Sequence, residues 1–232
     1  FSVTSFSQLL FDSESVTNYE FGIKSSWLKD RVIANASVFL MDYEDMQVSK
    51  RVEVLGGGGA VVGITTNAGK AETKGIEFDL KALVTEGLQI SAGVGYVSAT
   101  YTDYEDSGDS FNGNSLDNAP RWTANASAQY LFPIGELIGI ARLDYSYRSD
   151  YFIARENTSD QEVEGWDLFN AKVGVRSPDN GWEVSLSAKN LLDDTYIVGS
   201  GPGGFVPLTP SASETVSYGA PRLVSLNLKY DF

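Results

Sequence analysis

The sequence contains no cysteine and no histidine among its 232 residues. Without cysteine, the chain can form neither a disulfide bond nor a thiolate metal site. Without histidine, it lacks the commonest general base and the commonest ligand of transition metals. Together these absences exclude Ser–His–Asp catalysis, Cys–His catalysis and His-ligated zinc chemistry within this chain. We therefore predict that it is not an enzyme and has no resident cofactor or metal.

Long hydrophobic runs are absent too. No stretch approaches the about 18 consecutive apolar residues that indicate a transmembrane helix, and no basic start with an apolar core indicates a signal peptide. The opening stretch FSVTSFSQLLFDSESV is typical of the middle of a protein. Basic residues are scarce, since 17 Lys and Arg face 31 Asp and Glu for a net charge of −14. This balance argues against nucleic acid as a partner.

What the chain does contain is long segments in which apolar and polar residues alternate. Such alternation predicts strands with one apolar and one wet face. Each predicted strand is longer than the usual five or six residues. A β-propeller would have shorter strands, and Trp166–Asp167 is the only WD pair. A soluble sandwich is disfavoured because all nine segments share the alternation. The nine segments are residues 17–27, 31–48, 74–84, 88–104, 120–132, 137–151, 165–176, 182–197 and 219–232.

Short turns alternate along the chain with long polar loops. We expect the turns at residues 29–30, 85–87, 133–136 and 178–181, and the loops at 56–63, 105–118, 154–164 and 199–217. Aromatic residues gather at the strand ends. Long strands, an apolar face, aromatic girdles, and short turns opposite long loops are the pattern of an outer-membrane barrel. The predicted fold class is all-β, an antiparallel transmembrane β-barrel portion of about nine long strands.

The alternation also assigns side chains to the two faces. We predict lumen-facing positions at Lys172, Ser185, Asn227 and Lys229. The predicted lipid-facing residues are Phe169, Ala171, Val173, Val175, Val184, Leu186, Val224, Leu226 and Leu228.

Five stretches in order resemble the TonB-dependent outer-membrane receptors: ESVTNYEFGIKSSWLKDRVIANASVFLMDYEDMQ, NAGKAETKGIEFDLKA, LDNAPRWTANASAQYLF, LFNAKVGVRSPDNGWEVSLSAKNLLDDTYI and GAPRLVSLNLKYDF. The resemblance implies a 22-stranded barrel with an N-terminal plug domain and a TonB box. Residues 1–232 look like the C-terminal part of that barrel, with the plug domain and the first strands outside this chain. Because lipid does not tolerate open sheet edges, the rest of the barrel is an expected partner. A small standalone barrel is the alternative.

The resemblance also implies a function. It predicts a receptor in the outer membrane of a Gram-negative bacterium that imports a scarce ligand, such as a ferric siderophore, cobalamin or a glycan. The implied partners are outer-membrane lipid and lipopolysaccharide, the plug domain, and the TonB complex through the absent N-terminal region. A passive porin is the alternative function, and a barrel enzyme ranks last because histidine is absent.

Loop aromatics and one lumen arginine are the candidate ligand contacts. Phe111 and Phe205 lie deep in their loops, and Tyr104 and Phe152 lie at the loop rim. Aromatic side chains anchor many ligands, although an interfacial girdle is an alternative role. Arg148 is predicted to meet an anionic ligand, and pairing with the plug or with Asp144 is the alternative. Residues 103–114, DYEDSGDSFNGN, have acidic spacing but lack the final Glu of a calcium loop, so we expect a solvated loop, with a looser cation site as the alternative.

The last strand resembles the assembly signal of bacterial outer-membrane proteins. These proteins commonly end in Phe with apolar residues at alternate positions before it. Phe232, Tyr230 and Leu228 fit that pattern. We therefore predict that these three residues direct membrane assembly.

Overall fold

The computed structural model describes residues 2–3, 10–54, 61–67, 69–106, 108–202 and 214–231. Within these residues, one short 3₁₀ helix, η2 (Ser159–Gln161), accompanies the strands, and no helix is long and apolar enough to cross a membrane. The strands are β1 (Ser2–Val3), β2 (Ser15–Trp27), β3 (Val32–Glu44), β4 (Gln47–Val54), β5 (Val61–Asn67), β6 (Lys70–Leu83), β7 (Leu88–Asp103), β8 (Glu105–Asp106), β9 (Asp109–Ser110), β10 (Trp122–Ile134), β11 (Leu137–Arg148), β12 (Tyr151–Phe152), β13 (Glu162–Val163), β14 (Trp166–Arg176), β15 (Trp182–Lys189), β16 (Ile197–Pro202), β17 (Glu214–Tyr218) and β18 (Leu223–Tyr230).

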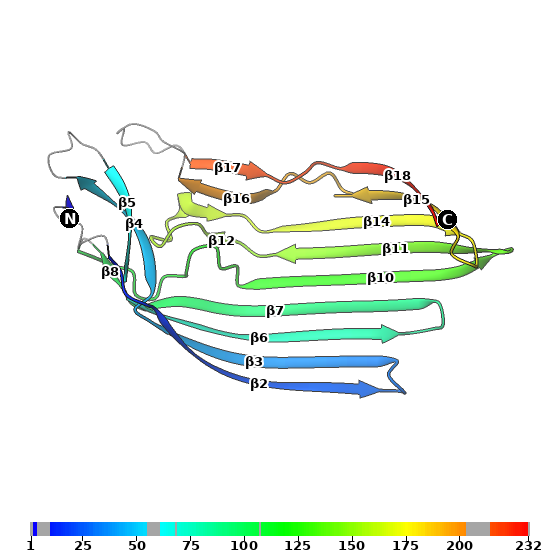
Figure 1. Ribbon diagram of the computed structural model, residues 1–232, viewed down its shortest axis with the longest axis horizontal. Helices are drawn as coiled ribbons and strands as arrows, with labels where there is room; N and C mark the ends of the chain where they lie inside the picture. The colour runs from blue at the N-terminus through cyan, green and yellow to red at the C-terminus, as the bar shows by residue number, and fades with distance from the viewer. Residues whose placement is uncertain are drawn as a thin grey trace.

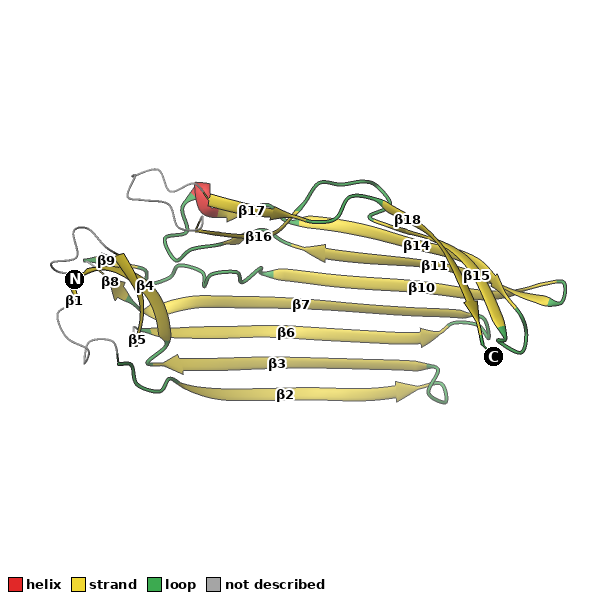
Figure 2. Cartoon of the chain, turned by 45° about the horizontal axis from the view of Figure 1, so that its top comes forward, coloured by secondary structure: helices red, strands yellow, loops and turns green. Residues whose placement is uncertain are grey.

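Nine long strands form one antiparallel sheet in the order β18-β15-β14-β11-β10-β7-β6-β3-β2. Short turns join β2 to β3, β6 to β7, β10 to β11 and β14 to β15 at one end, and the long connections lie at the other (Figures 1 and 2). The predicted fold class and the alternation of turns and loops are confirmed for this portion. Since neighbours in the chain are neighbours in the sheet, the strands run as a simple up-and-down meander.

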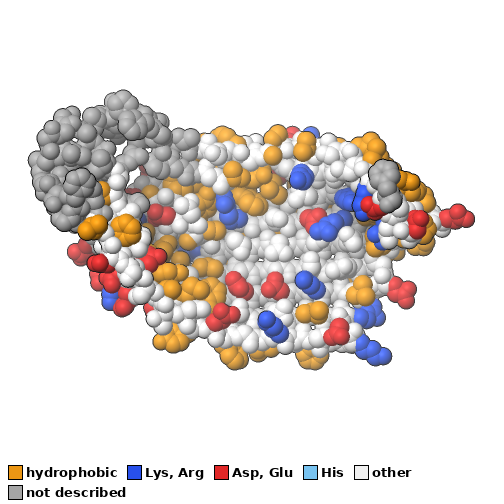
Figure 3. Space-filling model, viewed as in Figure 1, with side chains coloured by type: hydrophobic (Ala, Val, Ile, Leu, Met, Phe, Trp, Pro, Cys, Tyr) orange, Lys and Arg blue, Asp and Glu red, His pale blue; other side chains and the backbone are white. Residues whose placement is uncertain are grey.

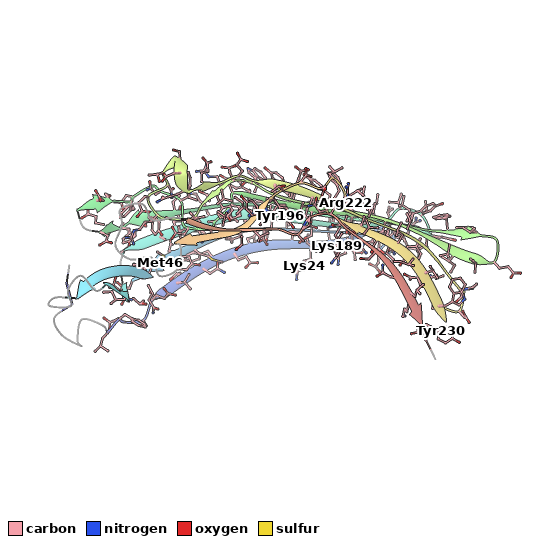
Figure 4. All side chains as sticks on the ribbon, turned by 90° about the horizontal axis from the view of Figure 1, so that it is seen from above. Lys24, Met46, Lys189, Tyr196, Arg222 and Tyr230 are labelled. Carbon is pink, nitrogen blue, oxygen red and sulfur yellow. The ribbon has the colours of Figure 1, made fainter. Side chains whose placement is uncertain are left out.

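The pairing register places the predicted apolar residues on one face. A single row of directly opposed residues crosses all nine strands, and every member is apolar: Trp27, Val32, Ala82, Ile90, Ala128, Leu143, Ala171, Ala188 and Val224. The sheet is curved, and Lys24 and Lys189, which belong to the opposite face, lie on the inner side of the curve (Figure 4). The apolar face is therefore the outer, convex one.

The concave face is polar over the middle of the sheet. One row on that face runs through Lys24, Asn35, Asp79, Gly93, Asn125 and Ser146. Figure 3 shows acidic and basic side chains over the middle strands and hydrophobic ones nearer the loop end. The predicted positions of Lys172, Ser185, Asn227 and Lys229 agree with this face, because they pair with one another across β14, β15 and β18 or with other polar residues.

The apolar side chains of the convex face form a band, which we call the apolar band. This band is tilted relative to the rows of directly opposed residues, which we call register rows. On β2 it runs from Tyr19 to Trp27, whereas on β18 it runs from Val224 to Tyr230. Because Trp27 and Val224 share a row, the band lies about seven residues nearer the turn end at β18 than at β2. Seven residues of about 3.4 Å across eight spacings of about 4.8 Å give a strand tilt of about 30°. Outer-membrane barrels tilt their strands by about 35–45°, so the slide matches a membrane-spanning wall.

Among the described residues, the nine-stranded sheet has no hydrophobic core of its own. The buried hydrophobic side chains gather near the loop end, except for Ile140 in the part of β11 near the turns: Ile64, Ala71, Ala99, Tyr101, Tyr104, Phe111, Ile140, Tyr151 and Val163. On the convex face, Leu226 is 67 % exposed and Leu228 74 %. A one-layer sheet with such a face is stable only if another apolar medium covers it.

Two of the predicted strands continue past a left-handed residue that ends the observed strand. The predicted strand 31–48 ends at Glu44, because Asp45 has a left-handed backbone (φ 54°). The chain then forms the β4–β5 hairpin, which we had not predicted, around the predicted loop at residues 56–63; residues 55–60 lie outside the described part. The predicted strand 182–197 ends at Lys189, because Asn190 (φ 48°) turns the chain and its side chain bonds both the nitrogen and the carbonyl of Asp194.

The β2–β3 turn is tied to its neighbour. Leu28, Lys29 and Asp30 all adopt left-handed backbone conformations. Arg31 then donates three hydrogen bonds to the carbonyls of Leu83 and Val84, at the start of the β6–β7 turn. Thus one arginine fixes the relative position of two turns at the turn end of the sheet.

Candidate ligand-binding rim

Three aromatic side chains form the most buried cluster among the described residues, at the loop end of β7. The ring of Tyr104 lies 5.1 Å from that of Tyr101 and 5.2 Å from that of Phe111, and Tyr104 is only 1 % exposed. Met46, Val48 and Leu116 pack against these rings. We call Tyr101, Tyr104 and Phe111 the rim cluster. It joins the β7–β10 loop (residues 104–121) to the start of β4, and Figure 4 shows Met46 at that end of the sheet.

Arg155 of the β11–β14 loop (residues 149–165) reaches across to the rim cluster. Its Nη1 donates to the Tyr104 hydroxyl at 2.5 Å, and its Nη2 donates to Asp106 Oδ2 at 2.9 Å. The guanidinium carbon lies 5.4 Å from the Tyr104 ring centroid and 5.3 Å from that of Phe111. Burial raises the pKa of the Tyr104 phenol, so the hydroxyl stays neutral and accepts from the arginine.

Further hydrogen bonds join the same two loops. Asn157 Oδ1 accepts from the Ser115 nitrogen at 2.6 Å, while Asn157 Nδ2 donates to the Ser115 carbonyl at 3.1 Å. Asn114 Nδ2 donates to the Arg155 carbonyl, and the Asn118 nitrogen donates to the Phe152 carbonyl, both at 2.8 Å. The loops are therefore connected along their length and not at one point.

A second aromatic group surrounds Arg148 on the concave face. The guanidinium carbon lies 4.4 Å from the Tyr151 ring and 5.2 Å from the Trp166 ring. Arg148 Nη2 also donates to the Ile197 carbonyl at 3.1 Å, and Trp166 packs on Tyr196 at 5.4 Å. Arg148 thus links β11, β14 and the segment that follows β15. Both Arg148 Nε and Trp166 Nε1 are buried without a hydrogen-bond partner among the described residues.

Deeper along the concave wall, some of the charged side chains form ion pairs. Arg142 forms a forked contact with Asp144, whose oxygens lie 2.7–3.0 Å from its nitrogens. Lys172 Nζ lies 2.6 Å from Glu183 Oε1. Arg142 and Lys172 are directly opposite one another across β11 and β14. Like charges in such positions repel, so each depends on its own carboxylate partner.

The structure brings some of the predicted contact residues together. Phe111, 7 % exposed, and Tyr104 meet in the rim cluster, where neither ring has a free face. Phe152 is half-buried in β12 and pairs with Glu162, and Arg148 is half-buried between its aromatic neighbours. Phe205 lies outside the described residues.

The residues of the predicted assembly signal occupy the turn end of the convex face. Leu228 pairs with Val184 and Tyr230 with Trp182. Tyr230 is 66 % exposed. Phe232 lies outside the described residues.

Metal binding finds no support in the loops. Across the described ranges, no group of three or more Asp, Glu, His or Cys side chains could hold a metal ion. In residues 103–114, β8 and β9 form a two-residue hairpin, and the Asn112 side chain accepts from the Tyr104 nitrogen. The looser cation site is therefore not supported.

Sequence reasoning missed Arg155, Trp166 and Tyr196. Arg155 is the one basic residue in an acidic loop, and that isolation was the available signal. Trp166 and Tyr196 gave no such signal, because each stands at a strand boundary where an interfacial aromatic is equally expected.

A tilted single-layer antiparallel sheet, apolar outside and polar inside, with turns at one end and interlocked loops at the other, defines the wall of an outer-membrane β-barrel. Residues 3–191 match the family model described as TonB dependent receptor-like, beta-barrel. The chain belongs to this family.

Individual relatives agree with that assignment. The ferric-pyoverdine M114 receptor PbuA of Pseudomonas sp. (strain M114) is 26 % identical over 223 residues, which cover 93 % of this chain and 24 % of the receptor. The ferric yersiniabactin uptake receptor FyuA from Yersinia pestis has a TM-score of 0.74 at 19 % identity, over 94 % of this chain and 30 % of that one. The copper transporter OprC has a TM-score of 0.69 at 18 % identity, over 94 % and 32 %. The chain spans about a quarter of the length of the curated relatives that it matches.

Proposed function

We propose that this chain is the C-terminal part of the barrel of an outer-membrane receptor that imports a ferric siderophore with TonB-coupled energy. The observation that carries this proposal is the similarity to a ferric-pyoverdine receptor over 93 % of the chain. The nine-stranded wall, with its apolar convex face, supports a location in the outer membrane of a Gram-negative bacterium.

The remaining barrel strands and the plug domain are the first proposed partners. β2 and β18 each pair on one side only within the described residues. An unpaired strand edge in lipid leaves backbone groups without partners, at a cost of several kcal/mol per group. Further strands therefore complete the barrel, and the plug fills the polar concave side and carries the contact to the TonB complex. Lipid and lipopolysaccharide cover the convex face.

The predicted contact residues take different roles in this proposal. Arg148 is half-buried on the concave wall and Phe152 is half-buried in the β12–β13 hairpin, and we assign both to the ligand's path. Tyr104 and Phe111 are buried, so they hold the shape of the rim instead of stacking on the ligand. Phe205 remains a proposed contact on sequence grounds. Phe232, Tyr230 and Leu228 remain the proposed assembly signal.

The ligand within the class is open to experiment. The same fold serves ferric yersiniabactin uptake in FyuA and copper transport in OprC, and fold alone does not fix the transported molecule. Cobalamin and glycans are the other ligands that this type of receptor could take. A passive porin is not favoured, because the similar curated proteins are receptors.

The test is uptake of radioactive iron by a deletion strain that carries the full-length gene. We expect accumulation of ⁵⁵Fe from a panel of ferric pyoverdines, and its loss when a protonophore collapses the inner-membrane potential. Arg148→Gln should weaken uptake, whereas Arg121→Gln, an exposed arginine of the β7–β10 loop, should leave it unchanged. Iron entry that persists without the potential would indicate a passive pore and contradict the proposal.

A further inference from the structure

We propose that the β7–β10 and β11–β14 loops move as a single lobe at the barrel rim, with Arg155 as the charge lock that holds them together. This inference concerns the rim itself and holds for any ligand that the barrel transports.

The two loops should repel one another. The β7–β10 loop has four acidic residues and one basic residue, and the β11–β14 loop has five acidic residues and one basic residue. Their net charges of −3 and −4 amount to half of the chain's −14. Like charges this close remain coupled at physiological salt, where the Debye length is about 8 Å. Something must offset that repulsion for the loops to remain in contact.

Arg155 supplies a positive charge between the two loops that offsets this repulsion. Its contact to Asp106 crosses from one loop to the other, and the two side chains are only 22 % and 13 % exposed. A second carboxylate, Glu156 Oε1, lies 3.4 Å from Arg155 Nε. Ion pairs this sheltered are screened little by salt, unlike the exposed acids on the loop tips. Removing the arginine would take away the cation that pairs with the sheltered Asp106 carboxylate, and breaking a sheltered ion pair is destabilising.

Neutral contacts set the geometry in which the lock acts. The paired hydrogen bonds between Asn157 and Ser115 fix the register of the two loops. The Tyr104 and Phe111 rings flank the guanidinium and cover part of its surface. These contacts join the loops but carry no charge that offsets the acidic residues. Without Arg155, we therefore expect the separation of the loops to depend on ionic strength.

The experiment measures the distance between the loops in the full-length receptor. Spin labels are attached at Asp109 and Asp160, two exposed residues on different loops, and pulsed electron paramagnetic resonance gives the distance distribution. In the otherwise unaltered protein we expect one narrow distribution that is the same at low and at high salt. In Arg155→Gln the distribution should broaden and shift to longer distances at about 0.1 M salt, then return toward the narrow form at about 1 M, where the Debye length is about 3 Å.

Controls separate the lock from general damage. Arg121→Gln removes one positive charge from the same region without crossing between loops, and should behave as the unaltered protein. Heat-modifiable migration on gels shows that each variant has a folded barrel. If Arg155→Gln kept the narrow distribution at both salt concentrations, or broadened it equally at both, Arg155 would not be a charge lock. Arg155→Lys, which keeps the charge, should retain most of the narrow population.

Discussion

The spanning sheet and the loop rim are stabilised in different ways. Among the described residues, Ile140 is the one buried hydrophobic side chain of the sheet away from the loop end, whereas the others lie near or in the loops. Its strands are joined by regular antiparallel pairing, and its outer side chains face the surrounding medium. The rim is joined by side chains from distant parts of the chain, such as Arg155 and Tyr104, 51 residues apart. The comparison shows that the stability of the wall depends on the apolar medium around it, whereas the stability of the rim depends on contacts between its own side chains.

The largest effect should come from a charge on the outer face of the wall. Leu226→Arg should lower the free energy of unfolding by about 2–4 kcal/mol in lipid vesicles, because a cation near the middle of the membrane is poorly solvated. Denaturant titration of the full-length protein in vesicles measures this.

The matched control is Asn227→Arg, one residue along the same strand. Asn227 faces the concave side and donates to Ser187 Oγ at 3.0 Å. We expect a loss of about 1 kcal/mol or less, the value of one exposed hydrogen bond. Equal losses for the two variants would contradict the assignment of the faces.

A steric change in the wall should matter more than the same change in a loop hairpin. A Cβ on Gly75 would lie 2.4 Å from the Tyr96 carbonyl oxygen and 2.6 Å from the Phe39 ring. Gly75→Ala should therefore cost about 1–3 kcal/mol through overpacking. At Gly63 a Cβ would meet nothing within 4 Å, so Gly63→Ala should stay within about 0.5 kcal/mol. Thermal unfolding of both variants measures the two losses of stability. Similar losses at Gly75 and Gly63 would contradict the expected difference between the wall and the hairpin.

The turn end should show an intermediate effect. Arg31→Gln removes the bonds to the Leu83 and Val84 carbonyls and should cost about 1 kcal/mol, since the group is exposed. Lys29→Gln changes a charge in the same turn and should cost less than about 0.5 kcal/mol. Amide hydrogen exchange at the β6–β7 turn should rise in the first variant alone. Unchanged hydrogen exchange in Arg31→Gln would show that the relative position of the two turns does not depend on this arginine.

The smallest effect should be at an exposed ion pair above the apolar band. Lys70 Nζ lies 3.2 Å from Glu44 Oε1, and the side chains are 53 % and 61 % exposed. A double-mutant cycle with Lys70→Gln and Glu44→Gln should give a coupling of about 0.5 kcal/mol or less, which disappears at high salt. A coupling that resists salt would place this pair in a more sheltered setting than the structure shows.

The sheet could be predicted from sequence because the alternation of apolar and polar residues is visible within each strand. Alternation along each strand assigned the faces of Val173, Leu186 and Leu226 correctly, and the turns followed from short polar interruptions. The strand ends were less predictable. Asp45 and Asn190 end their strands through left-handed backbones, which acidic and amide residues adopt only in some contexts.

The rim could not be predicted to the same degree, because its contacts join distant segments. The sequence indicated that Tyr104 and Phe111 matter, but it gave no sign that both rings are buried. That burial depends on Arg155 and Met46, which come from two other loops. Pairing across loops of this kind carries no periodic signal, so only the folded structure shows it.

The slide of the apolar band makes the wall resemble a screw thread. Trp27 lies at the turn edge of the band on β2, and Val224, in the same register row, lies at its opposite edge on β18. Residues level with one another in the membrane are therefore not partners in pairing, and a path that follows the paired residues descends as it turns. A molecule or domain that followed one row of paired residues along this wall would therefore rotate about the barrel axis while it moved along that axis.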